Sequence, residues 1–284
     1  MALRLTRNYQ EIKARANQIR EFFRQRGIPF DPKSAIDVLL TDAESLADIF
    51  VAGQSGSSAN QSLFNAAHLD RMADALLLLA GEPNCNAYLD KLTSNSLNFL
   101  ERSPSHAKDI YWEIELWATI KRNYANVRLV EPPDIVLDTP DGSLAIACKK
   151  IYSMKNVPRQ LSSAVKQLAP FNGVGIAAIN IDDLVPAGSM LSSPTAAEMN
   201  RFIDAGNIRF LSSFQRPILK YFESDRLSAI AICTNLLAEI TRDGTRFNNA
   251  RQMTVWVWPN LPVAVTNRIK FLADVMGAQM EYEW

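Results

Sequence analysis

The stretch DIVLDTPDGSLAIACKK, residues 134–150, contains two short apolar runs that flank the turn sequence TPDG at residues 139–142. Proline and glycine occupy positions that a type I turn favours, so the stretch predicts a β-hairpin. Asp134 opens the first run, and two adjacent lysines, Lys149 and Lys150, close the second. Lysine is rarely buried, so the charged end of this otherwise apolar strand needs a physical reason.

The pairing register of this hairpin decides which side chains meet at its open end. If the strands close around a two- or four-residue loop, Asp134 lies directly opposite Ala147 and shares its face. Lys149 projects from the same face, because side chains alternate along a strand. A three-residue loop with a bulge at Gly142 would shift the register by one residue and separate the acid from the lysine. The favoured register therefore brings Asp134 and Lys149 together.

An acid and a lysine at the end of a buried hairpin suit metal-assisted phosphate chemistry. A carboxylate can hold a hard divalent cation, and a backbone carbonyl on the neighbouring strand can complete the coordination. A lysine beside the ion can stabilise charge on a phosphate or orient an attacking water. The alternative is an exposed Asp–Lys pair, which contributes very little to stability.

Composition excludes several classes of protein. The chain has 284 residues, 48% of them hydrophobic and 21% charged, with a formal net charge of zero, which allows one large domain or two modest ones. Three widely spaced cysteines without a CxxC motif fit a reducing compartment, and two histidines leave little material for a zinc site or a histidine-based triad. The N-terminus lacks an apolar signal core and no apolar run reaches about 18 residues. We therefore expect a soluble, cytoplasmic protein with no membrane partner.

Charge is distributed unevenly along the chain. Residues 1–26 carry seven Lys/Arg and two Glu, and residues 31–90 carry nine Asp/Glu and two Lys/Arg. Residues 149–166 carry five bases and no acid. The last stretch makes a local phosphate-binding surface possible despite the neutral total, whereas a solvated helix face is the better interpretation of the first.

Hydrophobic periodicity divides the chain near residue 104. Before it, apolar residues at helical spacing predict helices, with a flexible connector at residues 54–62, in the segments 8–27, 31–53, 63–81 and 86–103. After it, helical patterns at 109–124, 157–169 and 263–278 alternate with strand-like runs at 127–131, 134–138, 144–150, 173–181, 226–240 and 251–259, and we expect the run at 226–240 to pass into a helix or loop. The pattern predicts a helical domain over residues 1–104 and an α/β domain with a mixed sheet over residues 105–284.

The residues of the hairpin resemble a known family. Pro133-Asp134, a spacer of twelve residues, and Ala147-Cys148-Lys149 are similar to the motif of the PD-(D/E)XK nuclease superfamily. The resemblance covers roughly residues 108–182 and implies a restriction-endonuclease-like mixed sheet flanked by helices. It also implies a divalent-metal-dependent nuclease, with Mg²⁺ or Mn²⁺ as cofactor and nucleic acid, DNA in the first place, as partner.

The helices on either side of the hairpin supply further candidates. In that superfamily the preceding helix often contributes a metal-binding glutamate, and here Glu113 shares the apolar stripe of its helix while Glu115 lies off it and is the second choice. A lone carboxylate on an apolar stripe is costly unless something binds it. The following helix commonly aims a glutamine or basic residues at the site, which implies a role for Gln167.

The chain departs from the family motif at Ala147, where the motif has an acid. No acid lies between Lys149 and Asp182 that could replace it. Three explanations remain open: replacement of a native acid at this position, metal binding by the remaining ligands alone, or loss of catalysis with retention of nucleic-acid binding. Loss of one acidic ligand is expected to weaken Mg²⁺ binding and to slow hydrolysis steeply.

These observations give one principal hypothesis and two alternatives. The principal hypothesis is a hydrolase that cleaves DNA in restriction, antiviral defence or repair. Its expected residues are Asp134, Lys149, Glu113 and Gln167 for catalysis, with Ala147 in the position of the missing acid; Asp134, Glu113 and the Cys148 backbone carbonyl for metal; and Lys150, Lys155, Arg159 and Lys166 for phosphates. The alternatives are an inactive module of the same fold that binds nucleic acid or a partner protein, and a plain α/β interaction domain. The sequence leaves open whether the substrate is RNA, whether a particular nucleotide sequence is preferred, and whether the protein is a homodimer or an accessory subunit.

Overall fold

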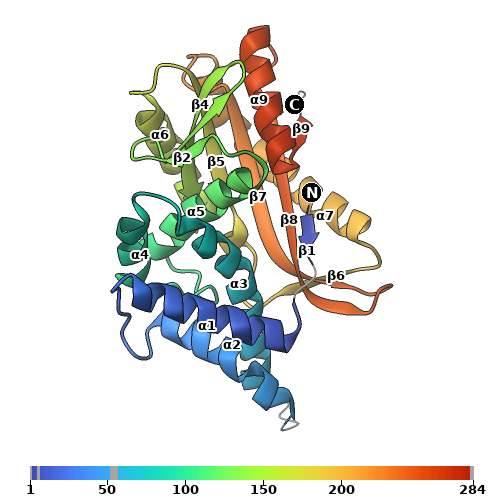
Figure 1. Ribbon diagram of the computed structural model, residues 1–284. Coiled ribbons are helices and arrows are strands. Elements are labelled where there is room, and N and C mark those ends of the chain that lie inside the picture. The colour runs from blue at the N-terminus through green and yellow to red at the C-terminus, as the bar shows by residue number, and fades with distance from the viewer. Residues whose placement is uncertain (1, 5–6, 52–56, 282–284) are drawn as a thin grey trace.

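The structure, a computed structural model, describes residues 2–4, 7–51 and 57–281. These residues form a mixed α/β fold, as the alternation of strands and helices predicted. Their strands join in one nine-stranded sheet of order β1-β8-β7-β5-β4-β3-β2, with β6 paired to β7 and β9 paired to β8. Figure 1 shows α1 and α2 side by side at one end of the molecule and α9 near the other, with the long strands β7 and β8 between them.

The strands are β1 Ala2–Arg4, β2 Val127–Leu129, β3 Ile135–Thr139, β4 Gly142–Lys150, β5 Val174–Asn180, β6 Met190–Ser193, β7 Ala229–Ile240, β8 Thr245–Val257 and β9 Gln279–Glu281. The helices are α1 Tyr9–Gln25, α2 Ala35–Val51, α3 Ser57–Leu79, α4 Cys85–Thr93, α5 His106–Asn123, α6 Val157–Leu168, α7 Ala196–Ser213, α8 Gln215–Phe222 and α9 Val263–Met276, with 3₁₀ turns η1 Met154–Asn156 and η2 Asp182–Leu184. Within the described ranges, no helix combines the length and the apolar character needed to span a bilayer.

The predicted hairpin consists of β3 and β4, and its predicted register is confirmed. Ile135 pairs with Ile146 in an antiparallel ladder that closes at a two-residue loop. Gly142 ends the loop with φ of +115°, a conformation that glycine adopts without the steric penalty of a side chain. Continuing the ladder by one residue places Asp134 beside Ala147.

The two faces of β4 are buried against different helices. Ile146 and Cys148 belong to an apolar cluster shared with α5, whereas Ala145 and Ala147 belong to a second cluster shared with α6. This division follows from the alternation of side chains along a strand. By the same alternation Lys149 faces α6. The β4–α6–β5 unit is parallel, so α6 covers this face of the sheet directly after the lysine strand.

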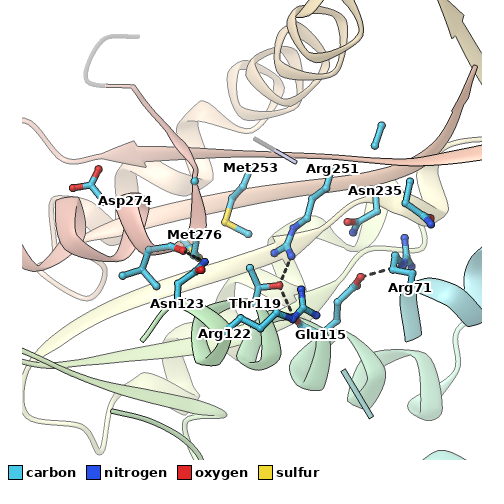
Figure 2. Close-up of a pocket in the computed structure, with 14 residues that line it drawn as sticks. Arg71, Glu115, Thr119, Arg122, Asn123, Asn235, Arg251, Met253, Asp274 and Met276 are labelled. Atoms are coloured by element: carbon cyan, nitrogen blue, oxygen red, sulfur yellow. Dashed lines mark hydrogen bonds and ion pairs between the residues drawn. The ribbon is translucent and has the colours of Figure 1, made fainter. Parts of the chain in front are cut away.

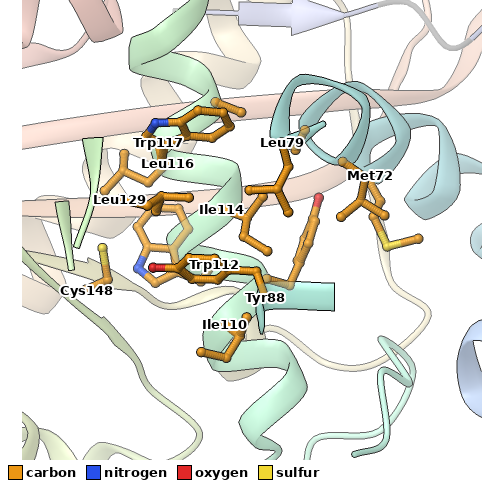
Figure 3. Packing of buried hydrophobic residues seen from close by; sticks show 14 of the residues in the cluster. Met72, Leu79, Tyr88, Ile110, Trp112, Ile114, Leu116, Trp117, Leu129 and Cys148 are labelled. Carbon is orange, nitrogen blue, oxygen red and sulfur yellow. The ribbon is translucent and has the colours of Figure 1, made fainter. Parts of the chain in front are cut away.

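Helix α5 is buried on nearly every side and joins the helical region to the sheet. Its Trp112 and Trp117 are at most 1% exposed. Figure 3 shows α5 residues packed against Leu79 of α3 and Tyr88 of α4 on one side, and close to Cys148 of β4 on another. Burial on several sides is typical of a helix in the interior of a fold, and α5 buries charged residues such as Lys108 and Glu115 along with its apolar ones.

The predicted division at residue 104 coincides with a change in architecture but not with a break in packing. Helices α1 to α4 all precede it, as expected. However, one apolar cluster runs from Ile12 of α1 through α5 to Ala273 of α9. The short strand β1 also pairs with β8, so the first described residues belong to the sheet rather than to the helical layer.

The uneven charge of the N-terminal region is neutralised by ion pairs between helices. Arg20 of α1 contacts Asp37 and Glu44 of α2, with shortest N–O distances of 2.8 and 2.5 Å. Arg15 of α1 lies 2.8 Å from Asp74 of α3. Arg15 and Arg20 of the basic first segment thus face carboxylates of the acidic second segment, whereas Arg24 remains exposed, as the sequence suggested.

Three expected elements differ from the structure. The helix expected over residues 86–103 ends at Thr93, and residues 94–103 are not helical. Strand β7 remains extended over its whole length, Ala229–Ile240, where we expected a transition to helix or loop, because β8 pairs with it along nearly all of that length. Helix α3 begins at Ser57, so the second part of the expected connector at residues 54–62 is helical. The remainder of that connector, up to residue 56, lies outside the described residues.

Candidate functional site at the open end of the hairpin

Asp134 stands directly before β3 and is held by the backbone of its neighbours. Its carbonyl oxygen accepts a hydrogen bond of 2.9 Å from the NH of Val130, which ties it to the end of β2. Its carboxylate is 3% exposed, and Oδ2 accepts a hydrogen bond of 2.6 Å from the backbone NH of Cys148. The side chain is therefore fixed against the end of β4.

Gln167 of α6 connects Asp134 to Lys149. The Gln167 Nε2 donates a hydrogen bond of 3.0 Å to Asp134 Oδ1. The Lys149 Nζ donates to Gln167 Oε1 and, at 2.9 Å, to the backbone carbonyl of Cys148. The acid and the lysine thus meet through the amide of Gln167, and the structure brings together three residues that were predicted to act together.

Glu113 reaches the same place from α5. In the described part of the chain it makes no hydrogen bond and no ion pair, although burial and the nearby Asp134 carboxylate raise its pKa well above the ordinary value of 4.5. Glu115, the second choice, lies elsewhere: it is 4% exposed and its Oε1 is 3.0 Å from Nε of Arg71. Periodicity placed Glu113 on the buried stripe and Glu115 off it, but in the structure Glu115 is buried and Glu113 is half-buried.

The two carboxylates are poorly compensated. Burial raises the pKa of Asp134 to about 6, from an ordinary value of 3.8, although Lys149, the Cys148 NH and Gln167 act in the opposite direction. For both acids burial is the largest cause, and the charge of a neighbouring carboxylate adds to it. A cation at this point would compensate the two carboxylate charges.

The donor set fits a divalent metal ion with few protein ligands. Asp134 and Glu113 offer carboxylate oxygens, and the Cys148 carbonyl is adjacent. Mg²⁺ commonly uses one or two carboxylates and keeps several waters, so two acids suffice. The described residues contain no group of three or more His, Cys, Asp or Glu side chains that could hold an ion.

Ala147 is fully buried in the α6-side cluster and supplies no ligand. Its position beside Asp134 and two residues before Lys149 is the one where the motif carries an acid. Cys148 faces the opposite side of the sheet and is 4% exposed, and burial raises the pKa of its thiol. Its backbone NH and carbonyl, and not its thiol, contact the site residues Asp134 and Lys149.

Lys150 does not join the surface bases as expected. It is 7% exposed, its Nζ donates a hydrogen bond of 2.6 Å to Asn180 Oδ1, and it lies 3.6 Å from Asp183 Oδ1. Asp183 also binds Lys108 at 2.8 Å. Alternation turns Lys150 away from Lys149 and into this interior cluster, so in this conformation it cannot reach a phosphate.

Lys155, Arg159 and Lys166 are exposed on η1 and α6. None of the three pairs with a described carboxylate. They follow Lys149 along the chain and lie on, or just before, the helix that carries Gln167, so this segment exposes basic side chains.

Sequence reasoning missed residues that α4 and the segment before β3 bring to the site. Tyr88 is 5% exposed; burial raises its pKa, and the charges of Glu113, Glu131 and Asp134 raise it further. Lys91 binds Glu131 at 2.5 Å. Tyr88 and Lys91 lie in the region assigned to a separate helical domain, and no local pattern connects them with the hairpin.

Comparisons of the chain with protein-family models, with curated proteins and with solved structures found no match. The case for a function therefore rests on the geometry of this site.

Proposed function

We propose that the protein is a divalent-metal-dependent nuclease with a restriction-endonuclease-like core and the site at the open end of β3 and β4. The observation that carries the proposal is the chain of contacts from Asp134 through Gln167 to Lys149, beside the unpaired carboxylate of Glu113. Four side chains from three helices and strands converge there, and a surface ion pair would not need such an arrangement.

The order of elements supports the same core. Helix α5 precedes the hairpin, α6 follows it and connects β4 to β5, and β5 pairs with β4 in parallel. This is the succession that the PD-(D/E)XK resemblance implies, with Glu113 on the first helix and Gln167 on the second. The remaining strands extend the sheet beyond β5.

Each residue has a distinct part in the proposed reaction. Asp134 and Glu113 would hold Mg²⁺ or Mn²⁺, which activates water and stabilises charge on phosphate when bound. The Lys149 ammonium would stabilise the developing negative charge on the phosphate. Gln167 orients both Asp134 and Lys149 through its two amide atoms. The exposed Lys155, Arg159 and Lys166 would contact the backbone of a DNA or RNA strand.

A second candidate is a non-catalytic module of the same fold that binds nucleic acid. Ala147 favours it, because the position of the third acid is filled by a buried methyl group. The existing hydrogen bonds to both Asp134 oxygens and to the Cys148 carbonyl also favour it, since the protein already satisfies these groups.

A cleavage assay separates the two candidates. Single- and double-stranded DNA and RNA are incubated with the protein and Mg²⁺ or Mn²⁺, using wild type, K149M, D134N and A147E. Exposed residues supply the matched controls, K270M for the lysine and D141N for the acid. We expect metal-dependent cleavage by wild type, a loss of about a hundredfold or more in K149M and D134N, and faster cleavage at low metal concentration by A147E.

The cleavage and binding results decide between the two candidate functions. If neither wild type nor A147E cleaves any substrate, although circular dichroism shows both folded, the nuclease proposal is wrong. Binding of nucleic acid that weakens in K155M, R159M or K166M would then support the non-catalytic module. Absence of both cleavage and binding would exclude both candidates.

A further inference from the structure

A pocket lined by polar and apolar side chains lies between α5, β7, β8 and the end of α9 (Figure 2). Its volume is about 440 Å³, within the range of about 300 to 1,000 Å³ that small-molecule sites occupy. Met253 of its wall belongs to the α5-side cluster, whereas Lys149 faces α6. The pocket is therefore separate from the candidate nuclease site and shares none of its residues.

Arg251 of β8 brings an uncompensated positive charge into this pocket. Its Nη1 donates to Thr119 Oγ1 of α5, as Figure 2 shows. Its Nη2 is buried and has no hydrogen-bond partner among the described residues, none of whose carboxylates forms an ion pair with Arg251. Arg251 as a whole is half-buried, but a guanidinium nitrogen shielded from water without an acceptor is costly, so the protein gains free energy if an anion arrives.

Asn235 and Asn249 offer hydrogen-bond acceptors in the same pocket. Each is 6% exposed, and each Oδ1 is buried without a partner in the described structure. The orientation of both amides is fixed by what their NH₂ groups contact. Asn235 Nδ2 lies 3.2 Å from the Asp182 carboxylate and Asn249 Nδ2 lies 3.3 Å from the carbonyl of Ala67, and both of these are acceptors. The unpaired atoms are therefore carbonyl oxygens, which require donors.

Sheet register places these groups next to one another. Asn235 of β7 pairs directly with Arg251 of β8, and Asn249 lies two residues before Arg251 on the same face. One cation and two acceptors thus converge from adjacent strands. Such a set matches a ligand that carries an anion and hydrogen-bond donors together.

The remaining residues that line the pocket are an ion pair, exposed residues at its mouth and an apolar wall. Arg71 is already paired with Glu115 at 3.0 Å, so it is not free for a ligand anion. Arg122 and, on the α9 side, the carboxylate of Asp274 line the pocket from exposed positions. Met253 and Met276 supply apolar surface, and thioether sulfur packs favourably on planar rings.

We propose that this pocket binds a small organic phosphate of the size of a nucleoside monophosphate. The phosphate lies at Arg251 with Arg122 at the mouth, because guanidinium groups bind phosphate oxygens through paired hydrogen bonds. Hydroxyl or amino groups of the ligand donate to Asn235 and Asn249. The ring packs on the methionines.

Calorimetry and thermal shift test the proposal with four probes, AMP, GMP, CMP and UMP. Adenosine, inorganic phosphate and succinate serve as comparators that lack the anion, lack the organic part, or carry carboxylates instead. The variants are R251M, R122M and the exposed control R216M, with K149M to exclude binding at the nuclease site. We expect at least one nucleotide to bind wild type, R216M and K149M alike, and R251M and R122M to bind about tenfold to a hundredfold more weakly.

The unliganded proteins give an independent measurement. Since R251M removes an unpaired, half-buried charge, its Tm should be no lower than that of R216M. The proposal is overturned if none of the four nucleotides binds, if only succinate or only inorganic phosphate binds, or if R251M and R122M keep wild-type affinity. Binding lost in K149M but kept in R251M would likewise overturn it, because the ligand would then lie at the hairpin site.

Discussion

The imidazole of His68, in α3, lies almost flat against the ring of Phe99, with 4.8 Å between ring centroids and 23° between the planes. Its Nδ1 is buried without a hydrogen-bond partner in the part of the chain that the structure describes. Burial lowers its pKa well below the ordinary value of 6.5, and the positive charges of Arg71, Arg102 and Lys150 lower it further. The folded protein therefore holds this histidine neutral.

Stability should consequently fall as the pH drops through the unfolded-state pKa of His68, near 6.5. Below that pH the unfolded chain binds a proton that the folded chain does not, so protonation favours unfolding. In urea unfolding between pH 7.5 and 5, H68F should lose less stability than wild type, because phenylalanine keeps the ring contact and does not titrate. The exposed His106 gives the control H106Q, which should follow wild type. Parallel pH profiles for wild type and H68F would contradict this account.

At the scale of single residues, the sequence predicted the local part of the candidate site. Asp134 and Lys149 follow from hairpin register and strand alternation, which are short-range rules. Lys150 was misjudged because its burial depends on Asn180 and Asp183, which β5 and η2 bring alongside it. The Arg251 pocket was not predicted, since its groups come from four elements that only the folded sheet brings together.

Helix α1 is held to its neighbours by ionic as well as apolar contacts. Arg20 binds two carboxylates of α2 and lies over the ring of Phe30, 5.6 Å from its centroid. Arg24, one turn later, binds only Glu21 of its own helix. The first arginine therefore joins two helices, whereas the second joins none.

Replacement of each arginine should show how much the ion pairs between helices contribute to stability, compared with an ion pair within one helix. R20M is expected to lower the free energy of unfolding by about 1 kcal/mol, since a partly buried pair shared by two acids contributes more than an exposed one. R24M should match wild type within error, because an exposed pair on one helix contributes little. Urea denaturation in low and high salt measures both, and the R20M effect should shrink in high salt. Equal losses for the two variants would show that the interhelix pairs have no special role.

The sequence predicted the helices and strands that have strong local patterns. It did not predict those whose conformation depends on pairing with a distant strand. Helix α6 and strand β5 lie within one residue of the expected segments at either end, because apolar periodicity and flanking turns define them. The far half of β7 reads as helix or loop, yet its pairing with β8 keeps it extended. Strand β6 and helices α7 and α8 form within residues 190–222, where no pattern had predicted an element.

On the scale of the whole molecule, the helical layer and the sheet share one apolar cluster. Met72 and Leu79 of α3 are fully buried against α5, as Figure 3 shows. Unfolding of the helical layer alone would expose this surface on both sides and would be unfavourable. The two regions should therefore unfold as one cooperative unit.

Two optical signals can test whether the two regions unfold together, because tryptophan fluorescence and circular dichroism report on different parts of the chain. None of the five tryptophans lies before residue 112, so their fluorescence reports on the α/β region. Far-UV circular dichroism reports in addition on α1 to α4. We expect the two signals to give coincident transitions in urea. Loss of the dichroism signal at a lower urea concentration than the fluorescence signal would instead show two independent domains.

Helix α5 contributes Glu113 to the hairpin site, and two residues later Glu115 to the wall of the Arg251 pocket. Because the helix is packed on nearly every side, a shift that adjusts one glutamate also moves the other. A substitution on α5 is therefore expected to affect both sites. One site can change independently of the other only through substitutions in the other strands and helices that line it.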